Sequence, residues 1–583
     1  MIKELVSHVR EYKKQAIATP LFMVGEVSME TVIPLVMSYL IDRGIERGDM
    51  GQIWLYGGIL LVTAMISLFS GVMSGRMAAI SSAGFARNLR HDMYYDIQDY
   101  SFSNIDKFST SSIITRLTTD VTNVQNAFQT ILRMAVRAPM TLIFSMIMAL
   151  TINARISMVF LVTLPVLACG IYYLMTHAHP IFRRVFKTYD KLNNVVQENL
   201  HGVRVVKNFV REDYEVEKFN SISTSIYDDF TKAEKLLAFM NPLMMVCIYT
   251  CTLIISWLGA RAIVASGNNP DLGMTTGQLM SLITYVIQIL SSLMMVSMVF
   301  LMITMSRASA QRIVEVLNEK SDITSPEGAK TEIQDGSIDF DHVHFSYARR
   351  SERDTLSDID LHIPSGAVVG VLGGTGAGKS TLVQLIPRLY DATTGTVKVG
   401  GADVREYDLT ALRDSVAMVL QKNELFSGTI KDNLRWGNEE ATDEEIQEAC
   451  RLAQADPFIQ EMPEKYDTWI EQGGTNVSGG QKQRLCIARA LLKRPKILIL
   501  DDSTSAVDTA TEARIRKAFA NELKASTKII IAQRISSVID ADKIVVVDDG
   551  RITGIGTHAE LLESNREYQE IYYSQMDRKE EAV

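Results

Sequence analysis

Long apolar runs fill the first half of the chain, whereas the second half alternates apolar and polar residues over short stretches. Six of these runs are long enough to cross the roughly 30 Å of hydrocarbon in a bilayer as helices, which takes about 20 residues each. The first run is too long for the apolar core of a cleavable signal peptide, so we expect it to remain as a span. The pattern predicts membrane-spanning helices at residues 15–41, 53–80, 128–151, 156–175, 239–265 and 278–305.

Two long polar stretches with helical patterning, at residues 86–126 and 182–235, separate some of these spans. Lys and Arg residues gather in both stretches and in the segment before the first span. Loops on the cytoplasmic side of a membrane carry an excess of Lys and Arg. We therefore expect the N-terminus, both polar stretches and the second half of the chain to lie in the cytoplasm.

Composition narrows the class of protein further. At 583 residues the chain is too long for one domain. Its formal charge of −9 comes with no basic stripe, so we expect no nucleic acid partner. The five cysteines are scattered, without the spacing of a disulfide framework or a zinc site.

A glycine-rich stretch in the second half carries the strongest chemical signal. Residues 373–380 read GGTGAGKS and fit the phosphate-loop pattern G-x-x-x-x-G-K-[ST], between an apolar strand pattern and a helical one. In such a loop the glycines let successive backbone N–H groups turn toward one anion, the lysine reaches the β- and γ-phosphates, and the hydroxyl binds Mg²⁺. We expect ATP and Mg²⁺ to bind at Gly373, Gly374, Thr375, Gly376, Ala377, Gly378, Lys379, Ser380 and Thr381.

A second motif, VSGGQ at residues 477–481, resembles the signature of ATP-binding cassette (ABC) ATPases. In that family the nucleotide lies between two cassettes, and the signature of one cassette grips the γ-phosphate held by the other at a helix N-terminus. The resemblance implies that this chain is half of a dimeric ATPase. The residues that would complete the partner's site are Ser478, Gly479, Gly480 and Gln481.

The order of spans, polar stretches and cassette resembles an ABC exporter half-transporter of the multidrug type over essentially the whole chain. The resemblance implies an all-α transmembrane domain of six helices at residues 1–320, a linker at 321–335, and an α/β P-loop nucleotide-binding domain at 336–583. It also implies coupling helices near residues 105–120 and 198–212, which rest on the cassettes and transmit their closure to the membrane.

Further residues match the family's nucleotide site. Tyr347 corresponds to the aromatic residue that stacks on adenine, and Asp501 to the carboxylate that coordinates Mg²⁺. Gln421 corresponds to a glutamine that touches Mg²⁺ and the attacking water. Asp508 corresponds to the loop that communicates between the two sites, and Glu471 to an acidic residue that contacts the coupling turns.

Two residues depart from the family's pattern, and both concern hydrolysis. The family has a glutamate that polarises the attacking water, where this chain has Asp502. The family has a histidine on the γ-phosphate, where this chain has Gln533, which cannot be protonated. The shorter acid withdraws its carboxylate by about 1.5 Å, and a misplacement of about 1 Å can cost roughly a hundredfold in rate.

These departures predict a site that binds ATP but hydrolyses it poorly. A homodimer would have two such sites, so we expect a heterodimer in which the partner carries the regular glutamate and histidine. The sequence thus resembles the degenerate-site subunit of bacterial heterodimeric multidrug exporters. A slowly hydrolysing homodimer is the alternative.

Charged side chains inside the spans raise the question of the substrate. Glu26 and Glu30 lie four residues apart on the first span, and Arg133 and Arg137 lie four apart on the third. An ionised group at the bilayer centre costs about 2.5–3.5 kcal/mol even on the lenient insertion scale, so these groups are expected to face the bundle interior or a wet cavity. Two interpretations stay open: the acids and arginines pair with one another, or Glu26 and Glu30 attract a cationic substrate.

The sixth span is rich in methionine, including Met295 and Met298. Thioether side chains repack around varied shapes, so these residues form either an adaptable wall for a substrate or ordinary packing. The resemblance to multidrug-type exporters implies ATP-driven export of hydrophobic or amphipathic compounds across a bacterial plasma membrane. Lipid flipping, siderophore import on an exporter-like fold, and ATP sensing without transport are the alternatives.

Overall fold

The computed structural model describes residues 1–268, 274–347 and 353–580, which form two compact units. The membrane unit comprises Met1–Gln98 and Thr110–Glu319. The cassette unit comprises Asp99–Ser109 and Lys320–Val583. A short segment between two membrane helices thus groups with the cassette.

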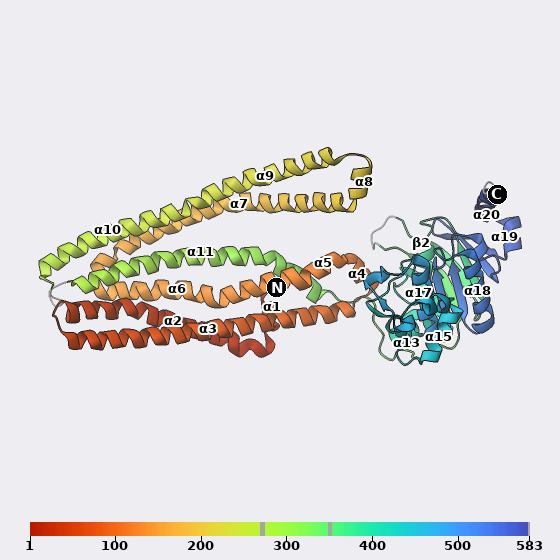
Figure 1. The fold of residues 1–583 in the computed structure, drawn as a ribbon, viewed down its shortest axis with the longest axis horizontal. Coiled ribbons are helices and arrows are strands. Elements are labelled where there is room, and N and C mark those ends of the chain that lie inside the picture. Colours follow the sequence, from red (N-terminus) through yellow and green to blue (C-terminus); the bar gives the residue numbers. More distant parts are fainter. Residues whose placement is uncertain (269–273, 348–352, 581–583) are drawn as a thin grey trace. The chain divides into compact units, whose positions relative to one another are not determined.

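Long helices make up the membrane unit (Figure 1). Its described residues contain six helical stretches long and apolar enough to cross a bilayer, which confirms the predicted number of spans. Their helices are α2 (Lys13–Tyr39), α3 (Met50–Gln98), α6 (Val121–Ser157), α7 (Val159–His201), α9 (Glu212–Ala238) with α10 (Met240–Ser266), and α11 (Thr276–Asn318). The short helices α1 (Ile2–Ser7), α5 (Thr110–Thr115) and α8 (Val203–Asn208) flank them.

The spanning helices continue far beyond their apolar runs. With 49 residues, α3 is about 74 Å long at 1.5 Å per residue, more than twice the thickness of the hydrocarbon. Helices α7 and α9 pack along each other, and α8 joins their ends (Figure 1). The polar stretches of the sequence are therefore extensions of the spanning helices.

Asn153 separates the third span from the fourth. Its φ of −156° and ψ of 101° interrupt the helix. Its side-chain oxygen accepts a hydrogen bond from the Ile156 N–H at 3.1 Å, as an N-cap residue does. Asn153 thus starts the short helical turn that leads into α7.

Packing inside the membrane unit joins helices that are far apart in sequence. Helix α2 packs on α3, α6 and α11, and α10 packs on α7 and α11. Side chains of α6, α7, α10 and α11 form a buried apolar cluster that includes Phe160, Ile255 and Tyr285.

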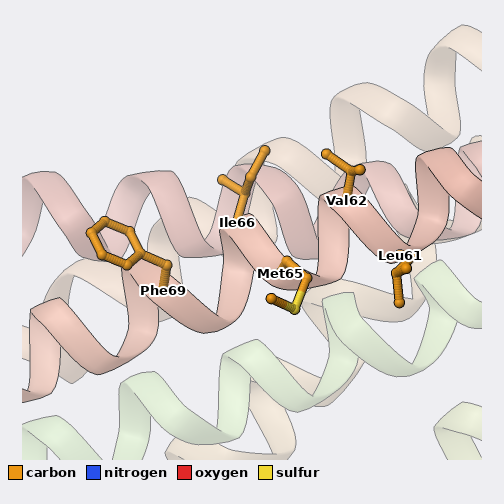
Figure 2. Close-up of a pocket in the computed structure, with 5 residues that line it drawn as sticks. All are labelled: Leu61, Val62, Met65, Ile66 and Phe69. Carbon is orange, nitrogen blue, oxygen red and sulfur yellow. The ribbon is translucent and has the colours of Figure 1, made fainter.

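One face of α3 carries apolar side chains that stay exposed. Figure 2 shows five of them around a shallow pocket, and each is between 45% and 67% exposed. Exposed apolar groups on a spanning helix suit contact with lipid chains. The five residues are Leu61, Val62, Met65, Ile66 and Phe69.

The cassette unit is built on a six-stranded sheet with the order β12-β11-β3-β10-β9-β6, in which only β12 is antiparallel to its neighbour. Its strands are β3 (Val368–Leu372), β6 (Val416–Val419), β9 (Ile497–Asp501), β10 (Thr527–Ile531), β11 (Lys543–Asp548) and β12 (Arg551–Gly556). A four-stranded antiparallel sheet contains β1 (Ile338–Phe345), β2 (Leu356–Ile363), β4 (Thr394–Val399) and β5 (Ala402–Asp403). Strands β7 (Gly428–Thr429) and β8 (Trp469–Ile470) form a third, small sheet.

Short helices connect and cover these strands, and two apolar cores lie among them. The helices are α12 (Lys379–Gln384), α13 (Leu409–Ser415), α14 (Ile430–Arg435), α15 (Asp443–Leu452), α16 (Asp456–Glu461), α17 (Gly479–Leu492), α18 (Thr509–Glu522), α19 (His558–Ser564) and α20 (Arg566–Glu580). The fold class predicted from the sequence, six membrane helices followed by an α/β cassette, is confirmed.

The order of the parallel strands gathers four motifs that are distant in sequence. The phosphate loop follows β3, Gln533 follows β10, Asp501 ends β9, and Gln421 follows β6. These strands are consecutive neighbours in the sheet. Their carboxyl ends share one edge, where open α/β sheets bind ligands.

Helix α4 (Phe102–Lys107) belongs to the cassette unit. It starts with a capping box formed by Ser101 and Asn104. The Ser103 hydroxyl donates a hydrogen bond to Asp322 at 2.8 Å, and Asp106 accepts one from the Tyr390 hydroxyl at 2.6 Å. Part of the first predicted coupling segment is thus anchored to cassette residues.

Candidate nucleotide site and membrane charge cluster

The phosphate loop is packed on one side and open on the other. Gly376 and Gly378 have φ of +85° and +96°, which favour glycine. A Cβ at Gly378 would lie 2.8 Å from a methyl carbon of Leu356, whereas a Cβ at Gly374 or Gly376 would meet nothing within 4 Å. The loop therefore has the shape that a phosphate cradle requires.

Lys379 folds back over this loop. Its Nζ donates hydrogen bonds to the carbonyl oxygens of Gly373 and Gly374 at 2.9 and 2.7 Å. Burial lowers the pKa of Lys379, against the opposing effect of Asp501 and Asp502. A phosphate would offer this ammonium a charged acceptor in place of two neutral ones, which is the stronger interaction.

Oxygen ligands suited to Mg²⁺ lie next to the loop. Ser380 Oγ donates a hydrogen bond to Asp501 Oδ1 at 3.0 Å, and burial raises the pKa of Asp501. Mg²⁺ prefers oxygen ligands and uses one or two carboxylates together with phosphate oxygens. The described residues contain no group of three or more His, Cys, Asp or Glu side chains that would hold a metal. Ser380 and Asp501 supply two neighbouring oxygen atoms, which fits an ion whose remaining ligands come from a nucleotide and water.

The two departures from the family's pattern contact each other. Asp502 Oδ2 accepts a hydrogen bond from Gln533 Nε2 at 2.8 Å and a longer one from Gln421 Nε2 at 3.4 Å. Burial raises the pKa of Asp502, while the two amides and Lys379 act to lower it. The structure thus brings both departures and Gln421 together around one carboxylate oxygen of Asp502.

Tyr347 lies after β1 and beside the start of α12. Its hydroxyl is 3.0 Å from the Thr381 hydroxyl and donates to Gln384 at 3.2 Å. Its ring meets the Tyr390 ring edge to face, with centroids 5.2 Å apart. The side chain is held in place yet half-exposed, as stacking on a base requires.

Sequence reasoning missed Tyr390. Besides Tyr347, its ring contacts Phe102 of α4 at 6.1 Å, and its hydroxyl bonds Asp106. Burial, with Asp106 close by, raises the pKa of Tyr390. Because Asp106 is 284 positions away, no local pattern could indicate this contact.

The signature residues form the N-terminus of α17. Ser478 caps the helix and exchanges hydrogen bonds with Gln481 in a capping box. A Cβ at Gly480 would lie 2.8 Å from the Ala506 carbonyl oxygen, so glycine is needed there. Val477 packs against the cassette core, whereas Ser478 and Gly479 are exposed. The exposed motif is free to meet a second cassette.

Two residues assigned to communication have local partners. Glu471 is exposed and accepts a hydrogen bond from the Thr475 hydroxyl at 2.9 Å. Asp508 is the N-cap of α18, and the Thr511 N–H that bonds it lowers the pKa of Asp508.

Ser505 connects the signature helix to the acid within this cassette. Its hydroxyl donates to the Asp502 carbonyl oxygen at 3.0 Å and accepts from Gln483 of α17 at 3.3 Å. Helix α17 and Asp502 are therefore linked by consecutive hydrogen bonds.

In the membrane unit, Arg137 binds both acids of the first span. Its two terminal nitrogens lie 2.6 Å from Glu26 Oε1 and 2.8 Å from Glu30 Oε2. A Cβ at Gly71 of α3 would lie 3.0 Å from the Glu26 carboxyl carbon, so glycine makes room for the charge. Arg133 Nε is buried and has no partner among the described residues. The contacts favour the paired interpretation of this cluster.

The two methionines of the sixth span have different surroundings. Met295 is half-buried, whereas Met298 is 70% exposed. They do not form one packed wall within this chain. Their role in a substrate cavity stays a prediction.

Fold and site together define a membrane protein that joins spanning helices to an ATPase cassette. Residues 17–319 match the family described as "ABC transporter transmembrane region", and residues 356–505 match the family described as "ABC transporter". The chain therefore belongs to the ABC transporter family and has the architecture of its exporters.

Relatives of this chain match it over nearly their whole length. "Uncharacterized ABC transporter ATP-binding protein YfiB" of Bacillus subtilis (strain 168) is 35% identical over 99% of both chains. "ATP-dependent lipid A-core flippase" of Desulfotalea psychrophila is 33% identical over 99% of both chains. "Putative multidrug export ATP-binding/permease protein YgaD" of B. subtilis is 30% identical over 98% of this chain and 99% of its own.

Proposed function

We propose that this chain is the degenerate-site half of a heterodimeric exporter that moves hydrophobic or amphipathic compounds across a bacterial plasma membrane. Its N-terminus and cassette lie in the cytoplasm, and it binds ATP with Mg²⁺. Its partner is a second half-transporter with the regular catalytic glutamate and histidine. The relative named as a multidrug exporter supports this class of substrate.

One observation carries the proposal: Asp502 stands in for the glutamate, and its Oδ2 is hydrogen-bonded by Gln533 in place of the histidine. The shorter acid reaches about 1.5 Å less far toward an attacking water. That oxygen already accepts hydrogen bonds from the Gln533 and Gln421 amides, so it is less available to accept a proton from an attacking water. Correctly placed general-base help is worth about 10²–10⁴-fold, so this pocket is expected to bind ATP and turn it over slowly.

Two exposed surfaces support the need for a partner. Ser478 and Gly479 lie open at the start of α17. At the α8 turn, Phe209 and Val210 are 69% and 81% exposed. Apolar side chains at a cytoplasmic turn are costly to leave in water. The cassette of a partner chain would cover Phe209 and Val210, and this contact would make α8 a coupling turn.

Transport then follows from closure of the two cassettes. Lys379 and the phosphate loop hold the ATP phosphates, Tyr347 orients the base, and Ser478–Gln481 bind the partner's nucleotide. Mg²⁺, when bound, would neutralise charge on the β- and γ-phosphates. The coupling turns carry closure to the membrane helices, which open the cavity outward. Hydrolysis, mostly at the partner's site, resets the cycle.

The test compares ATPase activity of the chain purified alone with that of the co-expressed pair, both reconstituted in vesicles. The pair should hydrolyse ATP at least about tenfold faster, since only its second site has a well-placed base. Lys379→Ala in the lone chain defines the background. Robust turnover by the lone chain that Lys379→Ala abolishes would refute the heterodimer proposal.

Lipid flipping is a second candidate, favoured by the relative named as a lipid A-core flippase. Vesicles that contain both a labelled lipid and a cationic dye separate the two. ATP-dependent dye movement without lipid translocation supports export of small compounds. Lipid translocation alone supports the flippase, and dye movement in the inward direction supports an importer.

A further inference from the structure

The C-terminal helix α20 holds the loop that carries Gln533. Gln575 Nε2 donates a hydrogen bond to the Gln533 carbonyl oxygen at 2.8 Å. The Ile535 N–H donates one to Gln575 Oε1 at 3.0 Å. One side-chain amide thus bonds main-chain groups on both sides of Arg534. We call this pair of hydrogen bonds the Gln575 clamp. Only Asn and Gln side chains carry a donor and an acceptor on the same planar amide, so few other residues could form it.

Helix α20 is itself anchored in the cassette core. Tyr568 is fully buried there, and its hydroxyl lies 2.7 Å from His558 Nδ1. Tyr568 and Gln575 are seven residues apart, which is about two helical turns, so they lie near the same face of the helix. Ile535 is buried in the same core. Packing of Tyr568 in the core therefore holds in place the part of α20 that carries Gln575.

The sheet secures the loop on its other side. The Ala532 N–H donates to the Val371 carbonyl oxygen at 3.3 Å, and the Asp502 N–H donates to the Ile531 carbonyl oxygen at 3.0 Å. Gln533 lies between these strand contacts and the Gln575 clamp, and its exposed side chain bonds Asp502. An exposed side chain reaches a single partner more readily when its main chain is fixed, because less conformational entropy is lost.

We propose that Gln575 is a positioning residue of the nucleotide site. It fixes the main chain at Gln533 so that the Gln533 side chain reaches Asp502 and the γ-phosphate of bound ATP. ADP lacks that phosphate, so the contact made through Gln575 would favour ATP over ADP at this site. The inference rests on the proposed ATP binding, and not on impaired hydrolysis or on a heterodimer.

The experiment measures binding of two probes to the full-length chain in detergent: AMP-PNP with Mg²⁺, and ADP with Mg²⁺. Gln575→Ala should weaken AMP-PNP binding about three- to tenfold, the range of one hydrogen bond, and change ADP binding less than about twofold. Gln569→Ala is the matched control. Gln569 lies on the same helix and bonds the Leu562 carbonyl oxygen, away from the site.

A double-mutant cycle with Gln533→Ala tests whether Gln575 acts through Gln533. If it does, adding Gln575→Ala to Gln533→Ala weakens AMP-PNP binding no further. Gln575→Glu covers the case in which the alanine variant folds poorly. It keeps the acceptor for the Ile535 N–H but sets a carboxylate oxygen against the Gln533 carbonyl, and should give the same selective loss.

Several results would overturn the inference: equal losses for both probes, additive losses in the cycle, or the same selective loss in Gln569→Ala. Failure of the unaltered chain to bind either probe would instead refute the proposed ATP-binding function, and this inference with it. The two failures are therefore distinguishable.

Discussion

At the scale of single residues, two amides surround the acid that follows β9. Gln533 and Gln421 both donate to Asp502 Oδ2, so the oxygen that would attract a water proton already accepts hydrogen bonds. The φ of +47° at Asp502 holds this residue in a backbone region that side chains seldom adopt. We therefore expect this site to bind the phosphates of ATP but to lack a well-placed base.

Restoring the family's residues should restore hydrolysis. Asp502→Glu together with Gln533→His should raise the ATPase rate of the lone chain by about tenfold to a hundredfold, because a longer acid and a protonatable ring supply general-base help and charge. Phosphate release under saturating ATP measures the effect. The same pair of substitutions in Lys379→Ala protein serves as a blank. Unchanged hydrolysis in the double variant would show that these residues do not limit the cycle.

At the scale of elements, charges and rings determine which helices stay together. Arg137 ties α6 to α2 through two carboxylates, and α3 accommodates the cluster with a glycine. Helix α4 is joined to the cassette through the Tyr390 ring and hydroxyl. Tyr390 also contacts Tyr347, the residue expected to stack on adenine. One side chain therefore contacts both α4 and the expected adenine site.

Removing Arg137 should destabilise the membrane unit. Arg137→Gln leaves Glu26 and Glu30 without their partner. Removing one member of a fully buried ion pair lowers the free energy of unfolding by about 3–5 kcal/mol. Both acids are only partly buried, so we expect a smaller cost of about 1–3 kcal/mol. Thermal unfolding in detergent measures it. Adding Glu26→Gln and Glu30→Gln should recover most of the loss, and no recovery would contradict the ion-pair account.

Removing the Tyr390 hydroxyl should loosen α4 without affecting nucleotide binding. Tyr390→Phe keeps the ring but loses the bond to Asp106, and a hydrogen bond to a charged group is worth about 1.5–3 kcal/mol. Hydrogen exchange at residues 102–107 should accelerate, while AMP-PNP affinity changes less than about twofold. Tyr407→Phe, which removes a buried hydroxyl bonded to Val399 elsewhere in the cassette, is the control. Equal exchange in both variants would argue against the contact.

At the scale of the whole molecule, the proposed partner would cover surfaces that are exposed in this chain. The signature residues open outward, and the α8 turn exposes apolar side chains. In the proposed pair of half-transporters, we expect each of these surfaces to lie in an interface.

Charge at the α8 turn should uncouple transport from hydrolysis. Phe209→Asp replaces a 69% exposed phenyl group with a carboxylate, so folding of the chain should change little. Burying an unpaired charge against a partner cassette is unfavourable, and dye transport by the assembled pair should fall at least about tenfold. Tyr227→Asp, at an exposed position further along α9, should transport normally. Normal transport in Phe209→Asp would exclude α8 from coupling.

The sequence by itself determined the class of the molecule. Length and apolarity of the runs follow from the thickness of a bilayer, and the phosphate-loop and signature patterns are local in sequence, so the spans and most nucleotide-site residues could be predicted. It also pointed to Asp502 and Gln533 as departures. It left two interpretations open for the charged residues of the first and third spans: ion pairs between these spans, or attraction of a cationic substrate.

Only the tertiary structure decided which distant side chains meet. Strand order put Gln533 and Gln421 on the same oxygen of Asp502, although they are 31 and 81 positions from it. The Tyr390 contact with Asp106 and the Gln575 clamp on Gln533 span 284 and 42 positions. These contacts depend on packing between elements, which neither hydrophobic periodicity nor a local motif encodes.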